Sequence, residues 1–497
     1  MSTFQERAIV TLEPVARSGV KRGLPKSAWR VRGLPFVVVA VGVFALVSSP
    51  VIFRPDSRGY LLRGDTPFGE TYGSLSFFGD ALRPWPTVLV FVAGPTIGVI
   101  AQYALYVTAV LLFCRAARRV SSPRAATFAL IASLALLLNR NSIQWLSIVH
   151  SEAVTAVLTI VTIAAVLLFL LPDGKPWLAV LAVSAAGLSV VNRPTQLPLF
   201  LVAAILVAVE SGRRKRFRQT VSILMLAGVA LIYAVGVNAA ISSHWAASES
   251  NFTAASGVER TSVGYFFLTA TGIGDARDSR SDRLYEALVN DPSVPPCVTE
   301  ARPVWEECVH CSIPRFADSC PIGVAWVNDE FQAWYARFLL QDPTYSLSLA
   351  ADALWQSAQQ EVQYAAPWSP VPPLVEKVFT GVRFPVTIGT LGPAALIGAV
   401  VALARLRRPR VGSVSESRTL DIALLAVLAA SLVSILLANF QMNMEVGRIS
   451  QPGVLGTFLA VILIVSRVGV GERPEQSWGA ALSDETDAHR ADGGLAR

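Results

Sequence analysis

The chain has 497 residues, of which 53% are hydrophobic and 15% are charged, and its mean hydropathy is +0.50. Soluble domains carry about 25% charged residues, so this composition excludes an ordinary soluble protein and favours an all-α polytopic membrane protein. The formal net charge of +7 is explained by orientation signals in short loops, so nucleic acid is not an expected partner.

Ten apolar segments follow a basic leader that covers residues 1–33. Most have the length of about 20 residues that a membrane-spanning helix needs. The first is expected to be an uncleaved span, and the three short ones (third, fifth and sixth) to be tilted, broken or partly buried. The expected spans are 34–53, 87–113, 125–139, 148–171, 177–191, 195–210, 219–242, 385–404, 420–438 and 453–469.

Lys and Arg predict how these spans are oriented in the plasma membrane. They are frequent in the leader and in the loops that follow the second, sixth and eighth spans, which we therefore place in the cytoplasm together with both termini. The transmembrane regions are then 34–242 and 385–470, and the tail 471–497 is expected to be disordered and cytoplasmic. The first loop, 54–86, and the loop between the seventh and eighth spans, 243–384, lie outside.

The long loop 243–384 predicts a small folded unit. Aromatic residues recur at helical spacing within 326–362, and Asp342-Pro343 is expected to separate two helices there. An even group of cysteines outside the cytoplasm predicts two disulfides, with three possible pairings. A zinc site that includes His310 is the alternative. The four cysteines are Cys297, Cys308, Cys311 and Cys320.

The best catalytic candidate directly follows the first span, in the run Arg54-Pro55-Asp56-Ser57-Arg58-Gly59-Tyr60. Asp56 can deprotonate an acceptor hydroxyl as a general base. Arg54 and Arg58 can keep it ionised or bind a phosphate, and Tyr60 belongs to the same expected substrate-binding set. The alternative is an ordinary loop carboxylate that pairs with its neighbouring arginines.

Three more candidates lie at outer turns between later spans. Glu152 opens the fourth span at the membrane boundary and is the second catalytic candidate; the alternatives are snorkelling or a salt bridge to Arg140 or Arg193. His150 is expected to form hydrogen bonds in substrate binding. Arg193 lies where basic residues are scarce, so we expect it either to bind an anionic headgroup or to pair with Glu152.

The entry to the last span supplies the remaining candidates for substrate binding. Glu445 and Arg448 precede Pro452, which is expected to start the last helix. Arg448 can bind a phosphate through two parallel hydrogen bonds, and an ion pair with Glu445 is the alternative. No cofactor is expected, since no glycine-rich phosphate loop is present.

The order and spacing of these motifs resemble those of the GT-C membrane glycosyltransferases, which use polyprenyl-phosphate sugars as donors. The resemblance covers most of residues 34–470. The matching segments are 55–60, 83–86, 151–152, 192–194, 338–345 and 445–452.

The resemblance implies a GT-C-like bundle and an inverting sugar transfer from a lipid phosphate to a hydroxyl acceptor (an envelope glycan, lipid or protein) on the outer face. Asp56 would be the general base, and Arg193 and Arg448 would contact the donor phosphate. Many members carry a second acidic residue beside the base; here Pro55 and Ser57 flank Asp56, so no divalent metal is expected.

The Ala/Val/Arg-rich composition suits a high-GC bacterium such as an actinobacterium, for which decaprenyl-phosphate sugars are a natural donor. Two alternatives to an enzyme remain open. A transporter or flippase of a lipid-linked glycan would need polar or charged residues in the middle of several spans. A non-catalytic envelope scaffold would display the cysteine-bearing loop.

Overall fold

The computed structural model describes most of the expected spans and part of the long loop. The described ranges are 33–48, 51–52, 85–122, 125–138, 143, 145–214, parts of 218–232, 279–300, 320–359, 388–407, 415–441 and 446–468. Secondary structure within these ranges is helical, apart from one isolated β-bridge between Ile52 and Ile148. Several predicted site residues lie outside them, namely Arg54, Asp56, Arg58, Tyr60, Cys308, Cys311 and Glu445.

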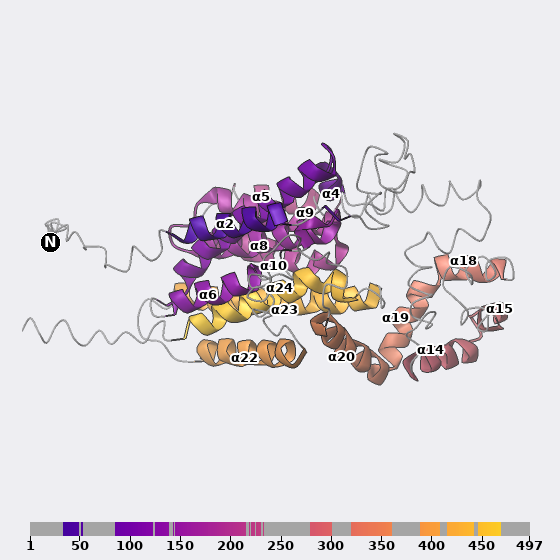
Figure 1. Cartoon of the computed structure of the whole chain (residues 1–497). Helices are drawn as coiled ribbons and strands as arrows, with labels where there is room; N and C mark the ends of the chain where they lie inside the picture. Colours follow the sequence, from indigo (N-terminus) through magenta and orange to yellow (C-terminus); the bar gives the residue numbers. More distant parts are fainter. Residues whose placement is uncertain are drawn as a thin grey trace, which may run out of the picture.

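A bundle of apolar helices forms the larger part of the molecule, and its helices run side by side (Figure 1). Among the described residues, four segments are long and apolar enough to cross a membrane: Pro95–Val120, Ser151–Leu170, Pro194–Arg213 and Ser417–Leu437. The bundle helices are α2 (Leu34–Ser48), α4 (Trp85–Val90), α5 (Pro95–Val120), α6 (Ala126–Leu137), α8 (Ser151–Leu170), α9 (Pro176–Asn192), α10 (Leu197–Arg213), α22 (Ile388–Arg407), α23 (Ser415–Gln441) and α24 (Val446–Ser466).

Helix α8 lies at the centre of the bundle. Nearly all of its side chains are buried, and it packs against α5, α9, α10, α23 and α24. Its 20 residues give a length of about 30 Å, which matches the hydrocarbon thickness of a bilayer. The peripheral helix α2 instead exposes large apolar side chains such as Phe36 and Val47, as a lipid-facing helix should. The prediction of a polytopic, all-α membrane protein is therefore confirmed.

The second span differs from its expected bounds of 87–113. The chain forms the short helix α4, turns, and starts α5 at Pro95. Gly94 has a φ of 103°, which glycine adopts at little cost, and Pro95 lacks the N–H that a continuing helix would use. Helix α5 then continues to Val120, so arginines that were expected in a loop belong to its last turns.

Two further boundaries also differ from the expected spans. Helix α2 ends at Ser48 rather than at residue 53, and the expected span 219–242 lies largely outside the described residues. Pro452 lies inside α24, so the prediction that it starts the last helix is wrong. The helix begins at Val446 instead, which extends it by more than one turn beyond the expected start.

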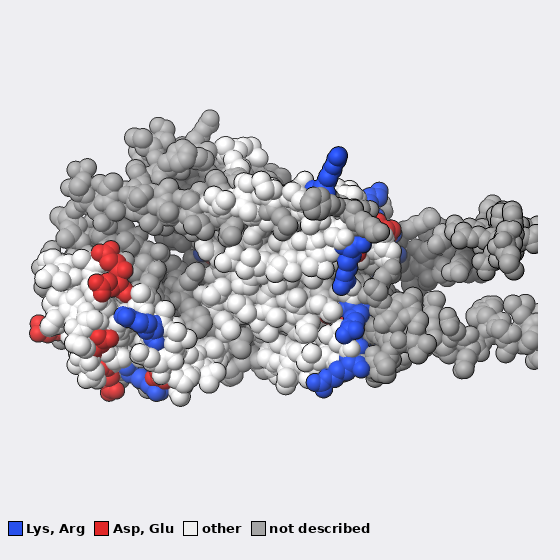
Figure 2. Space-filling view, turned by 180° about the vertical axis from the view of Figure 1, so that it is seen from behind, with Lys and Arg blue, Asp and Glu red and all other residues white. Residues whose placement is uncertain are grey.

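Arginines gather at one end of the bundle, called the basic end below (Figure 2). Several of them cap helix C-termini there. Arg214 donates to the carbonyl oxygens of Phe169, Leu171 and Gly174 after α8, at 2.9, 2.7 and 3.1 Å. Arg467 donates to the last carbonyl of α5, Val120, at 2.8 Å. These guanidinium groups satisfy backbone acceptors that lipid cannot.

A buried ion-pair network joins the last three bundle helices at the basic end. Asp421 of α23 accepts hydrogen bonds from Arg467, at 2.7 Å, and from Arg405 of α22, at 3.2 Å. Arg405 also donates to the carbonyl oxygen of Arg467. All three side chains are buried. Because Arg467 also caps α5, this network connects the second span to the last three.

A small helical unit, built from residues 279–300 and 320–359, lies beyond the opposite end of the bundle (Figure 1). Its aromatic core includes Trp326, Phe331, Trp334, Phe338 and Tyr345, whose rings contact one another in succession. The aromatic residues that recur at helical spacing in the sequence therefore form the buried face of this unit. The helices are α14 (Ser279–Asn290), α15 (Pro296–Glu300), α18 (Pro321–Asp329), α19 (Phe331–Gln341) and α20 (Pro343–Gln359).

The break predicted at Asp342-Pro343 is confirmed. Asp342 accepts a hydrogen bond from the Tyr345 amide at 2.9 Å, and Pro343 starts α20, which packs against α22, α23 and α24.

Asp291 connects the turn after α14 to α19, because it accepts hydrogen bonds from Ser293 and from the Trp334 indole. Hydrogen bonds from Ser293 and from the Trp334 indole hold the pKa of Asp291 below its usual value.

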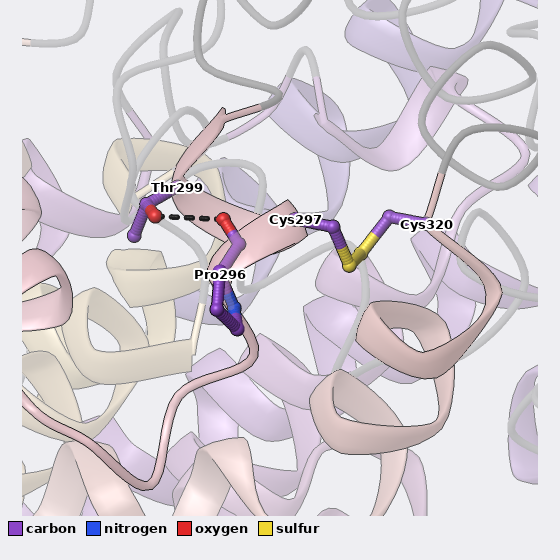
Figure 3. The surroundings of a disulfide bond; sticks show 4 residues. All are labelled: Pro296, Cys297, Thr299 and Cys320. Atoms are coloured by element: carbon purple, nitrogen blue, oxygen red, sulfur yellow. Dashed lines mark hydrogen bonds between the residues drawn. A yellow bond between two sulfur atoms is a disulfide. The ribbon is translucent and has the colours of Figure 1, made fainter.

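A disulfide between Cys297 and Cys320 connects α15 to the start of α18 (Figure 3). The two Cα atoms are 5.5 Å apart, which is the usual spacing for a bonded pair. This bond selects one of the three pairings that the sequence left open, in which Cys308 remains for Cys311. It also uses two of the four thiols that the zinc alternative required.

We predict that Asp421→Asn lowers the stability of the bundle by about 3–5 kcal/mol, because it leaves two buried guanidinium groups without their carboxylate. Thermal unfolding of the purified protein in detergent measures the loss. The matched control is Asp173→Asn, which removes an exposed carboxylate that pairs with Arg119 at the same end and should change the midpoint little. Equal effects of the two variants would contradict the structural role of Asp421.

We predict that Cys297→Ser and Cys320→Ser each destabilise the small helical unit by about 3 kcal/mol, since the bond closes a loop with a sequence separation of 23 residues. Protease resistance of the unit, measured at increasing temperature, reports the change. The double variant should lose no more than either single variant, because the first substitution already removes the bond. Additive losses would show that the two cysteines do not pair.

Candidate functional site

The first turn of α8 holds a buried carboxylate at the end of the bundle opposite the basic end. His150 caps the helix, and Glu152 follows two residues later with a side chain that is 2% exposed. The positive N-terminal end of a helix favours a carboxylate at this position. Nδ1 of His150 faces both the Ser151 amide, at 3.0 Å, and Glu152. It accepts from Ser151 when it carries no proton and donates to Glu152 when it carries one.

Arg193 follows the C-terminus of α9 and reaches Glu152. Its Nη2 lies 2.5 Å from Oε1 of Glu152, and its side chain is 18% exposed. The ion pair with Glu152, one of the two roles expected for Arg193, is therefore present. This ion pair is compatible with anion binding by Arg193. A guanidinium has five N–H donors, and the hydrogen bond to Glu152 uses one of them.

Asn192 connects three helices beside this pair. Its Nδ2 donates to the carbonyl oxygen of Ser151, at 2.8 Å, and to the hydroxyl of Thr155, at 2.7 Å, both in α8. Its Oδ1 accepts from the hydroxyl of Thr87 in α4, at 2.7 Å. Both ends of the Asn192 amide therefore have hydrogen-bond partners, and these bonds fix the end of α9, from which Arg193 extends.

The first loop begins directly beside the start of α8. Ile52 and Ile148 form a parallel β-bridge, in which the Ile52 amide donates to Ser147, at 2.8 Å, and its carbonyl accepts from Val149, at 3.1 Å. The Tyr103 hydroxyl of α5 lies 2.9 Å from the Ser147 hydroxyl and holds the same segment from the other side. The chain that leads to the first loop is therefore attached to the segment that leads to Glu152.

The structure brings together three of the residues predicted from the sequence, His150, Glu152 and Arg193. Arg448 lies near the start of α24, whose other end contacts α5 at the basic end, so its backbone is at the same end of the bundle as Glu152. The predicted residues of the first loop, and Glu445, fall outside the described residues.

Sequence reasoning missed two residues that organise the site, Asn192 and Thr87. In the segment 192–194, only Arg193 was expected to have a functional role. An asparagine at the end of a helix more often caps that helix than forms hydrogen bonds to neighbouring helices. Thr87 opened an apolar run and showed no polar pattern. Their hydrogen bonds depend on how α4, α8 and α9 pack, which local sequence does not encode.

Buried charged side chains lie at the two ends of the described bundle and not between them. Glu152 is buried at one end, and Asp421, Arg405 and Arg467 are buried at the other. Buried polar residues between the ends, such as Thr162, are uncharged. Within the described ranges, no group of three or more His, Cys, Asp or Glu side chains is arranged to hold a metal ion.

Comparisons with known proteins identify only remote structural similarity. The sequence matches no protein family model, and no curated protein matches it significantly. Two crystal structures of ArnT from Cupriavidus metallidurans are similar over 86% and 88% of this chain and 78% of theirs. The one bound to undecaprenyl phosphate has 16% identity and a TM-score of 0.31, and the apo one has 14% and 0.30. Scores at this level do not show a shared fold.

We predict that Asn192→Leu destabilises the bundle by about 2–4 kcal/mol, because it breaks three buried hydrogen bonds without changing the side-chain volume much. Thermal unfolding in detergent measures this loss. Ser189→Ala, one turn earlier in the same helix, removes a buried hydroxyl that has no partner among the described residues and should be nearly neutral. A loss in Ser189→Ala as large as that in Asn192→Leu would contradict the junction role.

Proposed function

We propose that this chain transfers a sugar from a polyprenyl-phosphate donor to a hydroxyl acceptor of the cell envelope, on the outer face of the membrane. Asp56 accepts the proton of the acceptor hydroxyl, whose oxygen attacks the anomeric carbon of the sugar. The bond from that carbon to the phosphate oxygen breaks, and polyprenyl phosphate leaves. An attack from the face opposite the phosphate inverts the anomeric centre.

The observation that carries this proposal is the parallel bridge between Ile52 and Ile148. Asp56 follows Ile52 by four residues, as Glu152 follows Ile148 by four. Four residues span at most about 14 Å, so chain length alone keeps the Asp56 Cα within that distance of the bridge. This bound supports an arrangement in which Asp56 works in the same region as the buried ion pair, although 96 residues separate it from Glu152 in the chain.

The distribution of charge supports chemistry at the membrane surface. Figure 2 shows the arginines gathered at one end of the bundle, which the positive-inside rule assigns to the cytoplasm. The candidate site is at the start of α8, and Arg214 of the basic end binds the carbonyl oxygens at the end of the same helix. The disulfide unit is on the same side as the site, as an oxidising compartment requires. A transporter would instead need charged or strongly polar groups along its interior, and the described interior carries only neutral ones.

In this proposal Arg193 contacts the donor phosphate, and Glu152 positions Arg193. Glu152 faces Arg193 with one carboxylate oxygen and His150 with the other, so its role is to orient the guanidinium rather than to react. A carboxylate beside the arginine also keeps the net charge of the site near zero before the donor binds. Arg448 is the second candidate for the phosphate.

We predict that Asp56→Asn reduces sugar transfer by about 10²–10⁴-fold, the usual range for loss of a general base, while donor binding is retained. The measurement is transfer of a radiolabelled pentose or hexose from decaprenyl phosphate to an envelope extract from a strain that lacks the gene. Asp65→Asn, in the same loop, is the matched control and should transfer at the wild-type rate.

Transfer by Asp56→Asn at the wild-type rate would overturn the assignment of the base. A gene-deletion strain whose envelope glycans and glycolipids match those of the parent would overturn the enzyme itself and favour the scaffold. Glycan and glycolipid analysis of that strain also identifies the sugar and the acceptor.

A further inference from the structure

Gln102 of α5 is a buried polar residue that the site described above does not use. Its side chain is 1% exposed, and neither Oε1 nor Nε2 has a hydrogen-bond partner within the described residues. A buried amide without partners destabilises a fold, because water solvates both of its ends in the unfolded chain. Buried groups of this kind in a native protein call for an explanation, and an absent ligand is one.

Contacts of its neighbours in α5 place Gln102 at the same end of the bundle as the candidate site. The next residue, Tyr103, reaches the Ser147 hydroxyl at 2.9 Å, three residues before His150. Gln102 therefore lies at the depth at which α8 begins, at the end of the bundle that holds Glu152.

The face of α5 that carries Gln102 is turned toward the connection between α4 and α5. Gly98, one turn earlier on the same face, packs so closely against the Phe91 ring that a β-carbon there would clash. Phe91 lies one turn after Thr87, which donates to Asn192. Gly98 therefore connects through Phe91 and Thr87 to Asn192, the residue before Arg193. Gln102 lies one helical turn after Gly98 in α5.

The chemistry of a primary amide indicates what it binds. The NH₂ group donates and the carbonyl oxygen accepts, so a hydroxyl group, which does both, satisfies both ends. A phosphate only accepts and would leave the carbonyl oxygen without a partner. An apolar polyprenyl chain would satisfy neither end. The complementary ligand is therefore a polyhydroxylated group such as a sugar.

We propose that Gln102 binds a hydroxyl group of the sugar that the lipid donor carries. This inference rests on the proposed function and adds to it the residue that distinguishes a sugar-bearing lipid from a bare polyprenyl phosphate. A site that hydrogen-bonds a substrate hydroxyl discriminates strongly against an analogue that lacks it, since the buried amide is then left without partners.

The test compares two lipids and three proteins in lipid nanodiscs. The lipids are decaprenyl phosphate and decaprenyl phosphate that carries a pentose or a hexose. The proteins are the wild type, Gln102→Met, which keeps an unbranched side chain of similar shape, and Ser133→Ala. Ser133 in α6 is the matched control, because its buried hydroxyl also has no partner among the described residues.

We expect Gln102→Met to bind the sugar-bearing lipid roughly tenfold more weakly than the wild type and to bind decaprenyl phosphate equally well. Its thermal midpoint should equal or exceed that of the wild type, because the substitution removes a buried amide without partners. Ser133→Ala should bind both lipids as the wild type does.

Four results would overturn the inference. They are unchanged binding of the sugar-bearing lipid by Gln102→Met, equal weakening of both lipids, failure of Gln102→Met to fold, and equal weakening in Ser133→Ala. The proposed function fails separately: a wild-type protein that binds neither lipid would overturn it, and this inference with it. Wild-type binding of both lipids with no loss in Gln102→Met would overturn the role of Gln102 alone.

Discussion

The arrangement of the candidate site depends on one buried ion pair, between Glu152 of α8 and Arg193 after α9. A charge at the edge of an apolar bundle is stable only when it is paired and hydrogen-bonded. The start of α8 must therefore lie against the end of α9, where Asn192 completes the contact. The segment that leads into α8 then bridges to Ile52 and determines where the first loop leaves the bundle.

At the basic end, arginine side chains stabilise helix ends instead of pairing with Glu152. Helices that end in or near lipid leave carbonyl oxygens that only protein or interfacial water can satisfy. Arg214 and Arg467 donate to those carbonyls at the ends of α8 and α5, and Asp421 neutralises part of the positive charge. The arginines that indicate orientation in the sequence are thus also structural, and they leave the opposite end free for a site with little net charge.

The fold was largely predictable from the sequence, because the length and apolar character of a segment determine whether it can cross a membrane. The aromatic core of α19 and the break at Asp342 were also predictable, since both follow from local spacing. Interactions between distant segments were not. The ion pair between Glu152 and Arg193 was one of two alternatives, and the disulfide of Cys297 was one of three, because each depends on helix packing. The junction at Asn192 has no local signal.

In the proposed arrangement, the first loop, the start of α8 and the end of α9 form one donor site. A cryo-electron microscopy structure with decaprenyl phosphate that carries a sugar tests it most directly. We expect the phosphate to lie against Arg193 and the Asp56 carboxylate to face the anomeric carbon from the side opposite the phosphate. A lipid phosphate bound at the basic end, with no density beside Arg193, would contradict it.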